Sequence, residues 1–190
     1  KSINWIIEYF SENSMEFVDI FKSSLPPKEK DIDRRTAPNL CGIVIPVQGE
    51  CSFSLNGDKY NLNKNTILHY GSNMKIKIET EDLGIEYYVV HYKNIFATEK
   101  FNTIERESFD LEIEDRISLL KYCESIIDKS LSPDNYSKFS CKVDFMKLID
   151  ALIKNVRASQ YNDKLKIVNK GIEYINKNRK LHCNFLFFPF

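Results

Sequence analysis

Residues 51–62, CSFSLNGDKYNL, restrict the possible folds more than any other stretch of this 190-residue chain. Apolar side chains alternate with polar ones on both sides of the Asn56-Gly57 pair. Asn-Gly suits a type I′ turn, in which both central residues have positive φ, and this turn joins antiparallel strands in a tight hairpin. The stretch therefore predicts a β-hairpin with one buried face.

The period of two continues through the surrounding sequence. Further strands are expected at 41–49, 66–71, 74–80 and 84–93, separated by short turns. Several short strands at this spacing, with no helix between them, indicate a small antiparallel barrel or sandwich. We assign residues 38–95 to this unit.

The sequence before the strands has a helical period. Apolar residues within 3–22 are spaced to predict one helix. Pro26 and Pro27 must end it, because proline has no N–H to donate and its ring clashes with the preceding turn. Residues 1–37 are therefore expected to form an N-terminal helix and an extended polar connector.

The helical period returns after the strands. Helices are expected at 114–130 and 134–159, inside a helical linker or dimerisation region that spans 96–163. The second helix has an apolar stripe with 4-3-4 spacing, which consists of Phe145, Ile149, Leu152 and Val156. Such a stripe either covers the core of its own chain or pairs with a second copy. Residues 160–164, QYNDK, are expected to be a short linker. The predicted fold class is α+β, a small antiparallel barrel of jelly-roll type followed by helices.

The C-terminal stretch concentrates positive charge. Residues 164–180 contain six Lys or Arg residues and one Glu, a net charge of +5. Because the whole chain has a formal net charge of zero, residues 1–163 carry −5. A basic helix after an acidic body suits contact with a polyanion such as DNA, although a solvated helix explains it equally. The candidate DNA-proximal residues are Lys166, Lys170 and Lys177.

The sequence offers little for catalysis or for metal binding. Its five cysteines are scattered without a CxxC pair, which favours reduced thiols in the cytoplasm. His69 and His91 lie on different expected strands without an HxH pair, so packed or hydrogen-bonded histidines are expected. Nucleophile, P-loop and dinucleotide motifs are absent from the sequence. We therefore expect a protein that is not an enzyme and uses no cofactor or metal. No run of about 18 apolar residues predicts a membrane span.

Binding of a small molecule is the function that the residues leave open. A barrel with aromatic side chains can enclose such a site, and ordinary core packing is the alternative explanation. Strand alternation puts Tyr88 and Tyr92 on one face and Tyr87 and His91 on the other, without saying which face is inside. The candidate ligand-binding residues are Tyr60, His69, Tyr70, Tyr88 and His91.

Three stretches, taken in order, resemble parts of one protein family. They are VQGECSFSLNGDKYNLNKNTILHYG (47–71), ILHYGSNMKIKI (67–78) and GIEYINKN (171–178). Their order resembles that of AraC/XylS-type bacterial transcription regulators, although Asn65 stands where the family commonly has Gly. The second stretch is similar to a subset of that family that senses iron-siderophores through a further domain.

The resemblance implies a cupin-like sensor barrel, a helical linker that mediates dimerisation, and the start of a helix-turn-helix DNA-binding domain at 164–190. The final residues, HCNFLFFPF, stand where the family continues into its DNA-reading helices. The chain is thus expected to be the effector-sensing and dimerisation part of such a regulator. It would be a cytoplasmic homodimer with a siderophore-related or sugar-like effector, and it would bind DNA weakly or not at all. The alternatives are a metal-free cupin-like interaction module and a cupin enzyme.

Overall fold

The computed structural model describes residues 1–96, 99–101 and 106–183. The helices are α1 (Ile3–Glu12), α2 (Arg116–Ser130) and α3 (Asn135–Cys183), with a short 3-10 turn, η1 (Glu99–Phe101). The strands are β1 (Ser14–Leu25), β2 (Lys30–Arg35), β3 (Cys41–Gly49), β4 (Cys51–Leu55), β5 (Asp58–Leu62), β6 (Thr66–Tyr70), β7 (Lys75–Glu79), β8 (Ile85–Phe96) and β9 (Phe109–Glu112).

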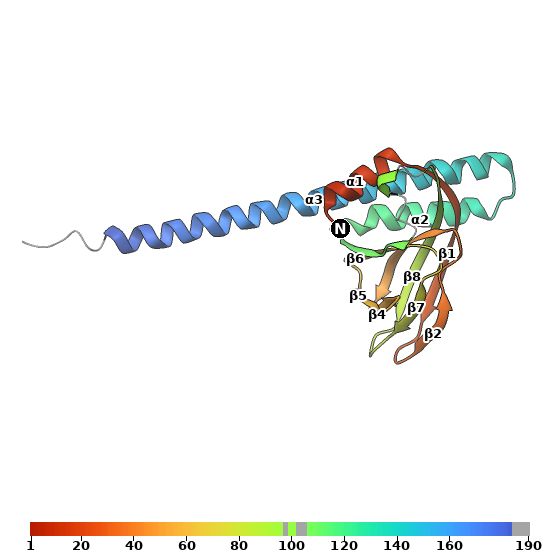
Figure 1. The fold of residues 1–190 in the computed structure, drawn as a ribbon, viewed down its shortest axis with the longest axis horizontal. Helices are drawn as coiled ribbons and strands as arrows, with labels where there is room; N and C mark the ends of the chain where they lie inside the picture. Colours follow the sequence, from red (N-terminus) through yellow and green to blue (C-terminus); the bar gives the residue numbers. More distant parts are fainter. Residues whose placement is uncertain (97–98, 102–105, 184–190) are drawn as a thin grey trace, which may run out of the picture.

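The strands form two antiparallel sheets that face each other (Figure 1). The first sheet has the order β1-β8-β3-β6-β9, and the second has the order β2-β7-β4-β5. Strands β1 to β8 thus follow the order of an eight-stranded jelly roll, the architecture of cupins. β9 is added beside β6. The predicted α+β fold class with a cupin-like jelly roll is confirmed.

The predicted Asn-Gly hairpin is present between β4 and β5. Asn56 has a φ of 51° and Gly57 a φ of 101°, as a type I′ turn requires. Leu55 pairs with Asp58 directly beside the turn. The inward-facing residues Phe53 and Leu55 are buried in the core between the sheets.

The single helix expected over 3–22 is wrong. α1 ends at Glu12, and β1 follows as an edge strand that pairs with β8. A register irregularity between Phe17 and Asp19 shifts the strand alternation. Phe17 and Ile20 therefore both pack toward the helices although they are three residues apart. The helix was expected from the spacing of Phe17, Val18 and Phe21, but Val18 and Phe21 are 37% and 44% exposed in the strand and do not share a buried face with Phe17.

Two more strands lie outside the residues assigned to the barrel. β2 lies in the segment expected to be an extended connector, and it pairs with β7 at the edge of the second sheet. β9 lies in the region expected to be helical and pairs with β6. The division of the chain into domains stays a prediction, but both sheets draw strands from beyond 38–95.

The helices cover the outer face of the first sheet. α2 and the first half of α3 lie side by side above it, together with α1 (Figure 1). The fold therefore has two cores, one between the sheets and one between the first sheet and the helices. β8 contributes to both, since Tyr87 and Val89 face the second sheet while Val90 and Tyr92 face the helices.

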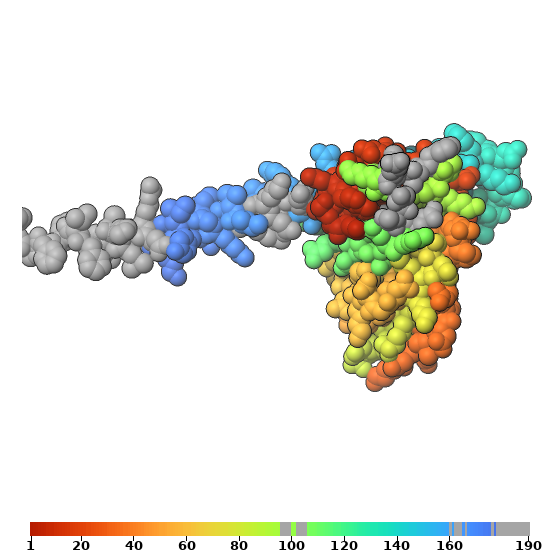
Figure 2. All heavy atoms as spheres, viewed as in Figure 1, coloured from red at the N-terminus to blue at the C-terminus, as the bar shows by residue number. Residues whose placement is uncertain are grey.

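α3 is one continuous helix of 49 residues, so the linker expected at 160–164 is wrong. QYNDK contains neither Gly nor Pro, and its residues have only modestly lower helix propensities than alanine. The second half of α3 extends away from the sheets and the other helices (Figure 2). Within the described residues, no helix has the length and apolar character needed to cross a membrane.

Candidate functional site

Four residues form a row across the first sheet, on the face that looks toward the second sheet. Asp19 of β1 is paired with His91 of β8, His91 with Gly42 of β3, and Gly42 with Tyr70 of β6. Neighbours in such a row point to the same face of the sheet. Tyr70 packs in the core between the sheets, which identifies that face.

Gly42 allows two of these side chains to meet. A Cβ at Gly42 would lie 2.2 Å from Cζ of Tyr70, because the tyrosine ring lies across the glycine backbone. The Tyr70 hydroxyl reaches the strand beyond, 2.9 Å from Nε2 of His91. A side chain at position 42 would occupy the path of the ring.

Asp19 determines the tautomer of His91. Nδ1 of His91 donates to the Asp19 carboxylate at 2.8 Å, so Nε2 accepts from the Tyr70 hydroxyl. The Asp19 side chain is 53% exposed, whereas Tyr70 is 4% exposed. The hydrogen bonds therefore connect the solvent at the edge strand with the space between the sheets.

Enzymes also use an Asp, a His and a hydroxyl, linked by hydrogen bonds in that order, to activate a nucleophile. Here burial raises the pKa of Tyr70 well above its ordinary value, and the charges of Tyr87 and Asp19 act in the same direction. The phenol therefore keeps its proton and acts as a hydrogen-bond donor to His91. This arrangement orients the Tyr70 ring and does not produce a phenolate nucleophile.

A second polar chain lies on the opposite face of the same sheet. Nε2 of His69 is 2.8 Å from the Tyr92 hydroxyl, which is 2.9 Å from the hydroxyl of Tyr9 in α1. Tyr9 donates onward to Oδ1 of Asn94 at 3.0 Å. The His69 ring stacks on Phe109 with centroids 4.5 Å apart. These bonds attach α1 to the sheet.

Burial lowers the pKa of His69 to about 3, against the opposing effect of a backbone hydrogen bond at Glu107. The imidazole is therefore neutral near neutral pH. It belongs to the core between the first sheet and the helices.

The five predicted ligand-binding residues do not form one site. Tyr70 and His91 meet between the sheets, whereas His69 and Tyr88 lie on the helix-facing side of the first sheet. Tyr60 is on the second sheet, where its hydroxyl lies 2.9 Å from Oγ of Ser108. Because His69 and His91 point to opposite faces, they cannot ligate the same ion. In the described part of the chain, no three His, Cys, Asp or Glu side chains gather as a metal site would require.

The four predicted dimerisation residues lie in the core between the helices and the first sheet. Their exposed fractions are 1% for Phe145, 2% for Ile149, 1% for Leu152 and 2% for Val156. The Phe145 ring lies 6.0 Å from that of Tyr92 and 5.7 Å from that of Phe17. A second copy could contact this stripe only after the core opens.

The predicted DNA-proximal residues lie on the projecting half of α3. Lys170 and Lys177 are exposed there. Lys166 is in the same helix, and its side chain is outside the described set. Residues 184–190, which contain most of the aromatic tail, also lie outside the described residues.

Asp19 and Gly42 are part of the row across the first sheet, although neither was predicted from the sequence. His91 is 72 residues from Asp19 and 21 residues from Tyr70, so only the strand register brings them together. Asp19 also fell inside a segment that was expected to be helical. No local pattern in the sequence pointed to either residue.

No family model and no curated protein matches the chain. Among solved structures, it is similar to a putative glyoxylate-induced protein from Pseudomonas aeruginosa, with 15% identity, a TM-score of 0.43, and coverage of 53% of this chain and 41% of that one. It is similar to unsaturated fatty acid-bound ToxT from Vibrio cholerae, with 14% identity, a TM-score of 0.44, and coverage of 72% and 56%. An RmlC-like cupin from Methanocaldococcus jannaschii shares 24% identity, with a TM-score of 0.34 and coverage of 43% and 72%. At these identities and scores, the similarities establish no family.

Proposed function

We propose that this chain is the effector-sensing and dimerisation part of an AraC-type transcription regulator. In coarser terms, it is a cupin-like ligand-binding module joined to an output helix. One observation carries the proposal: β8 belongs to both cores of the fold. Its residue His91 bonds to Tyr70 between the sheets, and its neighbour Tyr92 packs on Phe145 of α3.

The row from Asp19 to Tyr70 is the proposed point of ligand entry. Side chains fill the space between the sheets, so a ligand enters by displacing one of them. Tyr70 is suited to this because its hydroxyl bonds to His91 and its ring lies across Gly42, which has no side chain. Its displacement would release His91 and allow β8 to shift against α3. The ligand would then act by favouring one of two packings of the sheet and the helices.

Dimerisation in this proposal uses the projecting half of α3. Five apolar side chains there follow a 4-3-4-3 spacing, and they are Tyr161, Leu165, Val168, Ile172 and Ile175. Each is between 41% and 65% exposed. This spacing is that of a coiled-coil seam, and most of the stability of a helix in a protein comes from packing of its apolar face. A second copy of the same helix is the partner that the spacing fits.

The chain as it stands should bind DNA weakly. Lys170 and Lys177 provide positive charge on α3, but no second helix follows α3 within the described residues to enter a groove. Binding would therefore be non-specific and would weaken steeply with salt. Tight, sequence-selective binding in a gel shift at physiological salt would contradict the proposal.

Hydrogen exchange tests the sensing step. Small molecules, including sugars and ferric siderophores, would first be screened by thermal shift. A ligand that stabilises the protein should then protect both β8 and the first half of α3 from exchange. Protection of the strands alone, with α3 unchanged, would mean that binding does not reach the output helix. A Tyr70→Leu variant is the matched control, and it should lose the response in α3.

A further inference from the structure

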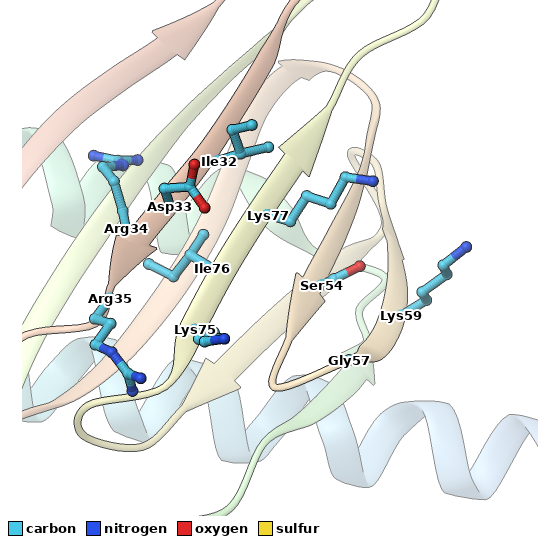
Figure 3. Close-up of a pocket in the computed structure, with 10 residues that line it drawn as sticks. All are labelled: Ile32, Asp33, Arg34, Arg35, Ser54, Gly57, Lys59, Lys75, Ile76 and Lys77. Carbon is cyan, nitrogen blue, oxygen red and sulfur yellow. The ribbon is translucent and has the colours of Figure 1, made fainter.

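The outer face of the second sheet carries a groove of about 550 Å³ that no part of the proposed sensing mechanism uses (Figure 3). Five of its lining residues are Lys or Arg and one is Asp. Five of the lining residues are together called the basic groove, and they are Arg35, Ser54, Lys59, Lys75 and Lys77. The groove lies on the side of the second sheet that faces away from the helices and the first sheet.

Strand register explains how the cations gather. Ser54 of β4 is paired with Lys59 of β5 on one side and with Lys77 of β7 on the other. Adjacent strands are about 4.8 Å apart, so the two lysines start roughly 10 Å apart with the Ser54 hydroxyl between them. Figure 3 shows Ser54 between the strands that carry these lysines. Both ammonium groups can therefore reach an anion that lies above Ser54.

The next outward row adds two more cations. Arg35 of β2 is directly paired with Lys75 of β7, two residues along the strand from Lys77. Like charges in directly paired positions destabilise a sheet. Lys77 has Glu79 as a partner at 2.8 Å, whereas no carboxylate among the described residues pairs with Lys59 or Lys75. The charge of this face is therefore incompletely neutralised within the chain.

Composition does not account for this concentration of charge. Residues 1–163 carry a net charge of −5, yet five of the ten residues that line this groove are Lys or Arg. The lining also has an apolar part, which includes Ile76 and Ile32, and Ile32 is 51% exposed. A volume of this size suits a small molecule.

We propose that the basic groove binds a small organic molecule that carries at least two negative charges on oxygen, such as a phosphate ester or a polycarboxylate. Lys59 and Lys77 would hold one anionic group over the Ser54 hydroxyl. Lys75 and Arg35 would hold the second, and an apolar part of the ligand would rest on Ile32. Because the groove is on the opposite side of the jelly roll from α3, this inference does not depend on the proposed regulator function.

Calorimetry with the full chain tests the site, using citrate and pyrophosphate as probes and acetate as the singly charged comparison. At about 50 mM salt, where exposed charges are only partly screened, citrate or pyrophosphate should bind and acetate should not. A Lys59→Gln/Lys75→Gln variant should lose about tenfold or more in affinity. The control, Lys93→Gln/Lys121→Gln, removes the same charge from exposed positions elsewhere and should stay within about twofold.

Three results would overturn the inference. The first is no binding of either multivalent anion, and the second is equal weakening in both double variants, which would indicate attraction to net charge alone. The third is binding of a short DNA duplex that the Lys59/Lys75 variant abolishes while both small anions fail to compete. That result would assign the groove to a nucleic acid. Circular dichroism of each variant should match the wild type, because all four substituted side chains are exposed.

Discussion

The ring of Tyr70 lies across the backbone of Gly42, and its hydroxyl meets His91 at 2.9 Å on the strand beyond. The row of contacts from Tyr70 through His91 spans four strands of one sheet and ends at Asp19 on the edge strand. This row of contacts joins the interior of the jelly roll to the edge strand β1.

Replacement of Gly42 by Ala should destabilise the protein by about 1–3 kcal/mol, because the new Cβ would lie 2.2 Å from the Tyr70 ring. Urea unfolding would measure the change. Gly171→Ala is the control: its Cβ would meet nothing within 4 Å, and in a helix Ala is favoured over Gly. Equal effects at the two positions would show that the ring does not lie where we describe it.

Removal of the Tyr70 hydroxyl should cost about 1–3 kcal/mol, since Tyr70→Phe leaves the buried Nε2 of His91 without a donor. Tyr60→Phe removes a hydroxyl whose bond to Ser108 is only partly buried, and its effect should be smaller. Unfolding free energies of both variants provide the comparison. A larger loss at Tyr60 would contradict the assigned bond.

Stability should fall as the pH falls from about 6.5 towards 3, because the pKa of His69 is lowered from 6.5 to about 3 in the folded state. In this range the unfolded chain binds a proton that the folded chain does not, so acid favours unfolding. The slope from this residue is at most about 1.4 kcal/mol per pH unit. This slope is absent above the pKa of His69 in the unfolded chain.

A His69→Phe variant should show a flatter pH profile than the wild type across that range. Tyr9→Phe is its control, since it removes a hydroxyl from the same polar chain and keeps the titrating ring. Urea unfolding at several pH values would separate the two. Identical profiles for wild type and His69→Phe would mean that the ring is accessible to protons.

Two pairs of aspartate substitutions on α3 should behave differently. Ile149→Asp/Leu152→Asp places charges in a closed core and should unfold the protein, whereas Leu165→Asp/Ile172→Asp should leave it folded and monomeric. Sedimentation velocity and circular dichroism measure association and folding separately. If the Ile149→Asp/Leu152→Asp variant is instead a folded monomer, the dimer contact would lie on the stripe that we describe as buried.

Local patterns were enough to predict most of the jelly roll. The alternation around Asn56-Gly57 specifies a hairpin whatever surrounds it, and its observed φ values agree. β1 was missed because the irregularity after Phe17 disrupts the alternation on which a strand prediction depends. Its pairing with β8 is a tertiary contact that no local window contains.

The candidate site was predictable only in part. Tyr70 and His91 were named from their residue types and strand positions, but nothing in the sequence indicated that they bond to each other. The sequence also did not separate His69 from His91, because the face on which each lies depends on the register of whole strands. For the basic groove, the alternating Lys75 and Lys77 were visible in the sequence, whereas Ser54 and Lys59 join them only through pairing.

The unbroken α3 has a mechanical consequence. Beyond Val156, which is anchored in the core, the helix runs on to Cys183, a length of about 40 Å at 1.5 Å per residue. Such a rod acts as a lever arm. A tilt of about 5° at its anchored base, within the range of small helix shifts that accompany ligand binding, would move its tip by roughly 3–4 Å. A helix shift of about 1–2 Å beneath Phe145 would thus become a displacement as large as a hydrogen bond is long.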